Sequence, residues 1–537
     1  MEPADLTRRI EPGMPVYPGD PGVTAESSAT MDSDGYRVTH LSFTTHVGTH
    51  IDAPAHMEPD GATLDEYGIA DFRFDARLVD LAGSGRDSGD DLGAREALLF
   101  VSLAWLLVPL VGTVPYLVAG EGTIATPVNA IFESVSGFTT TGATVLGDIS
   151  FDTHSHAILI WRQLTQWLGG MGIVVLAVAI LPELSVGGAQ LMDAEAPGPG
   201  IEKLTPRIAE TARVLWGIYL ALTLLEILLL YGLYQVGLAP EMTAYNAIAH
   251  GFTTLPTGGF SPEAYSIEAF SAAVQWIIVP FMIAAGTNFA LFWYVLNGEF
   301  GRFRRDSEFR FYAGILGVFT AVLAGTLFTG AGLSTVPDEM TAIVGDLEPS
   351  IRHAAFQVVS IITTTGYASV DFNAWGMPSK ALLFVGLFIG GSAGSTGGAV
   401  KIVRWLVIFK SIRRELFTTV HPDDVRPVRL GGRALDERAI RGIYAFTLLY
   451  FALFALAVVL LMLDAGRVGY GVTAFEVMSA VAATIGNVGP GFGAVGPMNS
   501  YLHFPGTSKL LMVALMWFGR LEILPVLVLF TPAYWRR

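Results

Sequence analysis

The sequence predicts an α-helical multi-pass membrane protein in which four similar units surround one central axis, preceded by a small, soluble, mostly-β segment. Three observations lead to this prediction. Of the 537 residues, 52% are hydrophobic, and several windows exceed the roughly 18 apolar residues that are typical of a bilayer span. A turn rich in threonine and glycine occurs four times, always between two long apolar segments. Residues 1–95 differ in kind, because they hold 18 Asp and Glu against seven Lys and Arg.

The repeated element is a short helical stretch that runs into the turn. Its four copies are Phe132–Val145, Asn246–Phe260, Ala355–Ala368 and Ala474–Gly491. Lipid cannot hydrogen-bond the backbone of such a turn, so the turn must be buried in protein or line a water-filled path. Four turns that meet on one axis would present rings of carbonyl oxygens, which can replace the hydration shell of an ion. The alternative is four unrelated glycine-rich loops, which would need the same context to arise four times.

Eight spans are expected, two around each turn. They lie near residues 97–119, 157–181, 212–236, 271–297, 310–334, 380–410, 440–464 and 507–531. Lys and Arg gather after each pair of spans, whereas Asp and Glu gather around the turns. By the positive-inside rule, the turns therefore enter from the outer side and residues 1–95 lie in the cytoplasm. The absence of a basic patch beyond short loops beside the spans disfavours nucleic acid as a partner.

The acidic segment contains a dense group of potential metal ligands in the stretch HVGTHIDAPAH. His46, His50 and Asp52 suit zinc or manganese, and the preceding run Tyr36–Thr44 alternates as strands do. With the upstream PVYPGDP, this motif resembles the cyclase family that includes bacterial kynurenine formamidase. The resemblance implies that His46, His50 and Asp52 bind a metal and that His56 is the catalytic acid/base.

The resemblance to the cyclase family ends too early for a complete site. It covers residues 1–82, and a Gly/Asp/Ser-rich linker follows at 83–95, whereas the family draws further His and Glu ligands from a second half. A half-built site retains too few ligands, and half a sheet leaves unpaired edges. We therefore expect an inactive remnant with no catalytic residue in use. The alternative is a metal-dependent amide hydrolase that the membrane domain anchors.

The remainder of the chain carries several motifs of another family. They are SGFTTTGATVL at Ser136–Leu146, WRQLTQWLGGMGIVVL at Trp161–Leu176, GGSAGSTGGAVKIVR at Gly390–Arg404 and AATIGNVGPGFG at Ala482–Gly493. Through them, residues 94–537 resemble the TrkH branch of the Trk/Ktr/HKT potassium transporter superfamily. The transport domain would cover 96–537, with units of about 96–200, 201–305, 306–435 and 436–537.

This second resemblance implies potassium uptake across the cell membrane through one pore per chain, with no cofactor for transport. It also implies a homodimer and a separate cytoplasmic Trk regulatory subunit that binds nucleotide. A sodium-conducting or mixed cation transporter of the same superfamily is the alternative. TrkH proteins usually begin with two extra spans, and here the cyclase-like segment takes their place.

Carried over turn by turn, the resemblance assigns a selectivity filter to three residues of each turn. These are Thr140, Thr141 and Gly142; Thr257, Gly258 and Gly259; Thr364, Thr365 and Gly366; and Asn487, Val488 and Gly489. Within the second turn, Gly259 or its neighbour Gly258 is the filter glycine. The fourth turn fits only with an insertion, so either Gly486 or Gly489 takes that position. We prefer Gly489, because Asn-Val-Gly-Pro-Gly is the closer analogue of a Thr-Val-Gly-Tyr-Gly filter. Glycine is needed there because a Cβ would crowd the pore and forbid the required dihedrals.

The sixth span contains a stretch of serine and glycine that interrupts an apolar helix. We interpret this stretch as an intramembrane gate below the filter, an interpretation that the resemblance to the TrkH branch strengthens. The gate residues are Gly390, Gly391, Ser392, Gly394, Ser395, Thr396, Gly397, Gly398 and Lys401, joined by Arg520 of the last span. The alternative for the loop is a small-residue packing face. Charges at the depth of Arg520 face a cavity or a partner; we expect Arg520 to contact the loop, and the alternative is that it neutralises Glu522.

Overall fold

The computed structural model describes residues 94–175, 208–331 and 343–536 apart from 423 and 425, and, nearer the N-terminus, 11–12, 14, 16, 21–30, 35–44, 63 and 66. The chain forms two compact units, Met1–Asp90 and Asp91–Arg537. In the first, strands β1 (Thr24–Ala29) and β2 (Val38–Ser42) pair antiparallel. Strand β2 lies within the alternating run that predicted a strand at Tyr36–Thr44.

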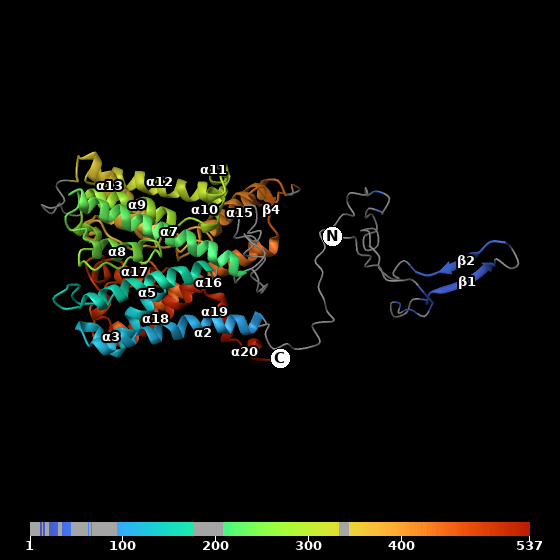
Figure 1. Ribbon diagram of the computed structural model, residues 1–537, viewed down its shortest axis with the longest axis horizontal. Coiled ribbons are helices and arrows are strands. Elements are labelled where there is room, and N and C mark those ends of the chain that lie inside the picture. Colours follow the sequence, from blue (N-terminus) through green and yellow to red (C-terminus); the bar gives the residue numbers. More distant parts are fainter. Residues whose placement is uncertain are drawn as a thin grey trace. The chain divides into compact units, whose positions relative to one another are not determined.

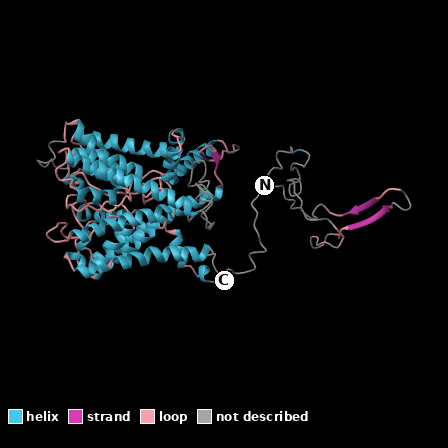
Figure 2. Ribbon diagram, in the orientation of Figure 1, coloured by secondary structure: helices cyan, strands magenta, loops and turns pink. Residues whose placement is uncertain are grey.

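Helices make up most of the second unit, and loops connect them, as Figures 1 and 2 show. The first spans of its four repeats are α2 with α3 (Ala94–Gly112, Val114–Ala119), α7 (Ile208–Gln235), α12 (Ser307–Phe328) and α16 (Glu437–Val468). The short helices before the turns, here called pore helices, are α4 (Pro127–Phe138), α8 (Ala244–Thr254), α13 (Leu347–Ile362) and α17 (Ala474–Ile485). The second spans are α5 (His156–Val175), α9 with α10 (Ala272–Ala285, Phe289–Leu296), α14 with α15 (Met377–Gly386, Ile402–Val420) and α18 with α19 (Gly506–Arg520, Leu524–Leu529).

Short elements connect these helices. They are α11 (Gly301–Arg305), the two-residue strands β3 (Arg429–Leu430) and β4 (Arg433–Ala434), α20 (Pro532–Trp535) and 3-10 turns at Gly122–Ala125, Ser266–Ala269, Phe372–Ala374, Gly493–Val495 and Tyr501–His503.

First and second spans differ in character. Among the described residues, four helical segments are long and apolar enough to cross a membrane, and each is the first span of a repeat. Between 22% and 33% of their most apolar windows is buried, so most of that surface is free to meet lipid. The second spans instead carry polar residues or are broken. This difference indicates that the second spans line the interior, where they can reach the turns.

Besides the one-residue break at Thr113 between α2 and α3, three expected spans are bent or interrupted. Helices α9 and α10 meet at 98° across Gly286–Asn288, so 271–297 is a sharply bent pair. The interruption of the sixth span is longer than expected, since α14 ends at Gly386 and α15 begins at Ile402. The last span breaks after Arg520, where Glu522 and Ile523 have φ of 58° and 62°. The segment between α14 and α15, residues 387–401, is here called the intramembrane loop. The other two breaks adjoin it, because the α9–α10 bend is hydrogen-bonded to Ser392 and Gly394, and Arg520 is hydrogen-bonded to Thr396.

The repeats form a closed ring. The second span of one repeat packs on the pore helix of the next, with α5 on α8 and α9 on α13. Phe384 of α14 contacts Phe475 of α17, and α18 closes the ring on α4. One cluster of buried apolar side chains joins α9, α12, α13 and α14, and another joins α4, α5, α16, α17 and α18. Because the clusters lie between repeats, the turns are held at the centre by the packing of their surroundings.

Candidate functional site

The four pore helices end in the same way. A residue just past each helix end adopts a left-handed conformation, although none is glycine: Thr140, Thr257, Thr364 and Asn487 have φ of 50°, 55°, 61° and 53°. It directly follows the C-cap in α4, α13 and α17 and is the second residue after the C-cap in α8. The next amide donates to the carbonyl five residues earlier, as in the Schellman closure of a helix. The N···O distances are 2.8 Å from Thr141 to Ser136, 2.9 Å from Gly258 to Thr253, 2.8 Å from Thr365 to Ser360 and 2.8 Å from Val488 to Ala483. This closure turns the chain at the helix end in every repeat.

The glycine after each closure also has positive φ. The angle is 79° at Gly142, 75° at Gly259, 81° at Gly366 and 101° at Gly489. By the same register, Gly258 corresponds to Thr141 and is the residue before the glycine. Gly486 is the C-cap of α17 with φ of −83°, so it corresponds to Thr139. The backbone therefore aligns Gly489, and not Gly486, with the other three glycines.

The four glycines close a ring through the carbonyls of the next turn. A Cβ on Gly142 would lie 2.1 Å from the oxygen of Gly258, and one on Gly259 would lie 1.9 Å from that of Thr365. A Cβ on Gly366 would lie 2.1 Å from the oxygen of Val488, and one on Gly489 would lie 2.6 Å from that of Thr141. No side chain fits at these distances. All four glycines line a single pocket.

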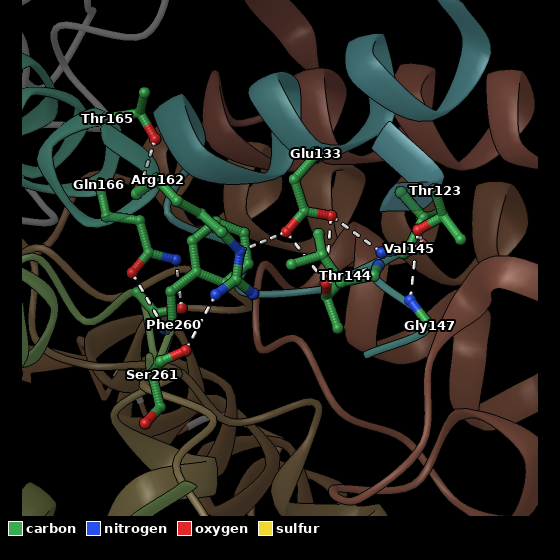
Figure 3. A network of polar contacts seen from close by, with 12 residues as sticks. Thr123, Glu133, Thr144, Val145, Gly147, Arg162, Thr165, Gln166, Phe260 and Ser261 are labelled. Atoms are coloured by element: carbon green, nitrogen blue, oxygen red, sulfur yellow. Dashed lines mark hydrogen bonds and ion pairs between the residues drawn. The ribbon is translucent and has the colours of Figure 1, made fainter. Parts of the chain in front are cut away.

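A buried ion pair supports the first turn from behind (Figure 3). Arg162 Nε on α5 lies 2.5 Å from Glu133 Oε1 on α4, and neither side chain is more than 1% exposed. The carboxylate of Glu133 also accepts hydrogen bonds from Thr144 Oγ1 and from the amide of Val145 at 2.8 Å. Arg162 Nη1 donates to the carbonyl of Ser261 at 3.0 Å, which joins the first turn to the second.

Gln166 bridges α5 to the second turn. Its Nε2 donates to the carbonyl of Gly258 at 2.7 Å, and its Oε1 accepts from the amide of Phe260 at 3.1 Å. Asn487 links the fourth turn to the first in a similar way, because its Nδ2 donates to Thr141 Oγ1 at 2.9 Å. The sequence patterns identify neither the pairing of Arg162 with Glu133 nor the links through Gln166 and the Asn487 side chain, because each joins residues of separate elements.

Replacing Arg162 by leucine is expected to destabilise the folded protein by about 3–5 kcal/mol, because it leaves the Glu133 carboxylate buried without its partner. Thermal unfolding in detergent measures the loss. Arg302→Ala is the matched control, since Arg302 pairs with Glu299 at an exposed site, where an ion pair is worth at most about 1 kcal/mol. Equal thermal unfolding midpoints for Arg162→Leu and Arg302→Ala would contradict a stabilising role for the buried ion pair.

The intramembrane loop lies directly under the ends of the pore helices. Thr396 Oγ1 donates to the carbonyl of Leu255 at 2.9 Å, and the amide of Gly398 donates to Thr364 Oγ1 at 2.7 Å. The amide of Ala399 donates to the carbonyl of Gly486 at 2.9 Å. These contacts reach the second, third and fourth turns, so the loop crosses the axis on the side opposite the pocket.

Further contacts hold the loop to its surroundings. Its start and end are paired through Gly390 N and Val400 O at 2.8 Å and through Ile402 N and Gly391 O at 3.1 Å. Two bonds join the loop to the α9–α10 bend: the amide of Ser392 donates to the carbonyl of Gly286, and the amide of Phe289 donates to the carbonyl of Gly394. Within the loop, Ser395 Oγ donates to the carbonyl of Ser392. Lys401 Nζ donates to the carbonyl of Gly397. The packing-face interpretation is wrong here, because the loop is not helical.

Arg520 makes the contact expected of it. Its Nη1 donates to the carbonyl of Thr396 at 2.8 Å, and the side chain is 2% exposed. Glu522 instead pairs with Arg404 of α15, with 2.5 Å between Oε2 and Nη2. Neutralisation of Arg520 by Glu522 is therefore not what the structure contains.

His250 lies on the second pore helix, and the potential metal ligands of the cyclase-like motif lie in the N-terminal segment. His250 is a packed histidine, with Nδ1 at 2.7 Å from Asn246 O and Nε2 at 3.1 Å from Ser261 Oγ. His46, His50, Asp52 and His56 lie outside the described residues.

Four apolar spans around a ring of glycine turns, with a loop crossing beneath, define a membrane transport protein. The chain belongs to the TrkH family, whose model, described as "Cation transport protein", matches residues 80–537. The "Putative cyclase" model matches residues 4–98, past the expected boundary at 82.

Known relatives support this membership. The "Trk system potassium uptake protein TrkH" of Escherichia coli K12 is 41% identical over 454 residues, which cover 84% of this chain and 88% of that protein. The protein of the same name from Halomonas elongata is 39% identical over 457 residues, covering 84% and 88%. The crystal structure of the potassium transporter TrkH from Vibrio parahaemolyticus superposes with a TM-score of 0.71 at 35% identity, covering 84% of this chain and 88% of that one.

Proposed function

We propose that this protein takes up potassium across the cell membrane through a selectivity filter built by the four turns. The observation that carries the proposal is the ring in which each glycine abuts a carbonyl of the next turn. Relatives that cover most of the chain are named as potassium uptake proteins. Backbone carbonyls at this ring would replace the water around a dehydrated ion. The C-terminal ends of four pore helices converge on the same place, and their partial negative charge favours a cation.

The intramembrane loop acts as the gate of this pathway. Its contacts with Leu255, Thr364 and Gly486, at the ends of three pore helices, support this role, because an ion that leaves the filter would meet the loop there. Arg520 and Lys401 add positive charge there and donate to loop carbonyls. A cation must pass this barrier, so conduction requires the loop to move.

Orientation and partners follow from charge and family. The pocket lined by the glycines opens to the outside, and the basic helix α11 and the end of α15 face the cytoplasm together with residues 1–95. We expect a homodimer that binds a cytoplasmic nucleotide-binding Trk regulatory subunit. The orientation fits the excess of Lys and Arg at 302–305 and 410–441.

Growth of a potassium-uptake-deficient host at low external potassium tests the function. We expect the full chain to restore growth, together with uptake of rubidium or potassium that sodium does not compete away. Restored sodium entry without potassium uptake would identify the sodium-conducting alternative. No cation flux in cells or liposomes, from protein shown to be in the membrane, would overturn the proposal.

Deleting residues 1–88 is expected to leave potassium uptake largely intact, because the helical unit begins at Asp91 and its spans begin with α2. The full chain should also lack formamidase activity, since the cyclase-like segment is too short to complete its ligand set. Uptake by the truncated chain and hydrolysis of N-formylkynurenine by the full chain are the two measurements. Hydrolysis that disappears in His56→Ala would favour the anchored amide hydrolase.

A further inference from the structure

The carbonyls around the glycine ring are not equivalent. Within the described residues, those of Gly142, Gly259 and Gly366 accept no hydrogen bond, whereas that of Gly489 accepts one from Tyr501 Oη at 2.7 Å. This phenol lines the pocket, and its side chain is almost fully buried. Of the four filter glycines, Gly489 is thus the one whose own carbonyl is held by a side chain from outside the turns, whereas Gln166 holds the carbonyl of Gly258, one residue before a filter glycine.

Tyr501 is itself rigidly placed. Its amide donates to the carbonyl of Thr144 in the first turn at 2.8 Å, and its ring lies 5.5 Å from that of Phe132 on α4. The residue therefore connects the fourth turn, through its hydroxyl, to the first turn and first pore helix, through its backbone and ring. Such placement fixes the direction of the Gly489 carbonyl.

We propose that Tyr501 is a selectivity-determining residue of the filter. This inference rests on the proposed function and assigns a further residue to the same site. The phenol hydrogen puts partial positive charge beside the Gly489 oxygen, so that oxygen offers a passing cation a weaker field. The same bond prevents the oxygen from moving inward. A weaker field and a fixed distance both disfavour the smaller, more strongly hydrated sodium ion relative to potassium.

Tyr501→Phe removes the hydroxyl and retains the ring against Phe132. Without the hydrogen bond from Tyr501, the Gly489 carbonyl presents a stronger field to the ion and can move inward toward a smaller ion. Both effects shift the ion preference of the filter toward sodium. We expect the potassium-to-sodium permeability ratio of the full chain in liposomes to fall about threefold to tenfold, the range of one hydrogen bond, with potassium flux close to that of the parent. A loss of fold alone would reduce both fluxes and leave their ratio unchanged.

Tyr245→Phe is the matched control, because Tyr245 Oη also donates to a backbone carbonyl, that of His156 at 2.9 Å, away from the glycines. A ratio in Tyr501→Phe equal to those of the parent and Tyr245→Phe would overturn the inference and leave the proposed function standing. If the parent carries no cation flux, the proposed function fails and this inference fails with it.

A second readout does not require transport. Potassium should raise the thermal midpoint of the parent in detergent more than sodium does, because an ion bound only by the folded protein stabilises it. In Tyr501→Phe this difference should shrink or reverse. An unchanged difference would count against the inference even if the variant reconstitutes poorly.

Discussion

Replacing Gly366 by serine is expected to lower the preference for potassium over sodium about tenfold or more without preventing insertion. The new Cβ would stand 2.1 Å from the carbonyl oxygen of Val488 and 2.8 Å from Pro490 Cδ, and φ is 81°. The third and fourth turns must separate to admit it. Strain at such a position costs about 1–3 kcal/mol, and about 1.4 kcal/mol corresponds to a tenfold change in an equilibrium. Potassium and sodium fluxes in liposomes give the ratio.

Gly317→Ser is the control for this substitution. Gly317 lies on α12, and a Cβ there would meet nothing within 4 Å. The Gly317→Ser variant should insert into the membrane and conduct as the parent does. If Gly366→Ser keeps the parent's ratio while conducting normally, the glycine ring does not discriminate between the two ions.

Much of this site could be predicted because its information is local. Each turn directly follows its own pore helix in the sequence, and the Thr/Gly pattern marks where that helix ends. The preference for Gly489 over Gly486 came from the similarity of Asn-Val-Gly-Pro-Gly to a filter sequence, and the backbone angles agree with it. Arg520 was found because a charge within an apolar run requires a partner.

What could not be predicted depends on contacts between distant residues. Glu522 lies two positions from Arg520, yet its partner is Arg404, more than a hundred residues away in sequence. The ion pair of Arg162 with Glu133 and the bond from Tyr501 to Gly489 likewise join separate elements. The sequence does not reveal the 98° bend between α9 and α10, because Gly286–Asn288 interrupts the apolar window by only a few residues. The loop that this bend contacts lies in the next repeat, far away in the sequence.

Replacing Arg520 by alanine is expected to raise potassium flux about tenfold in liposomes that contain no regulatory subunit. The buried guanidinium donates to the carbonyl of Thr396 at 2.8 Å, and such a charge-assisted bond is worth about 1.5–3 kcal/mol. Losing it favours the open state of a two-state gate by about tenfold or more. It also removes a positive charge from the path of the cation. Because Glu522 pairs with Arg404, the substitution leaves no carboxylate without a partner, so the fold should survive.

Other bonds to the loop determine how the result should be interpreted. Thr396 Oγ1 still donates to Leu255 O, and Ser392 N to Gly286 O at 2.8 Å, so Arg520→Ala loosens the loop without releasing it. Deleting Gly394–Gly397 removes the crossing itself and should raise flux at least as much. Arg467→Ala, at an exposed guanidinium, is the control and should conduct as the parent does. If the Arg520 variant and the deletion both insert normally and conduct no faster than Arg467→Ala, the barrier lies elsewhere, because neither the tether nor the loop would then limit the flow of ions.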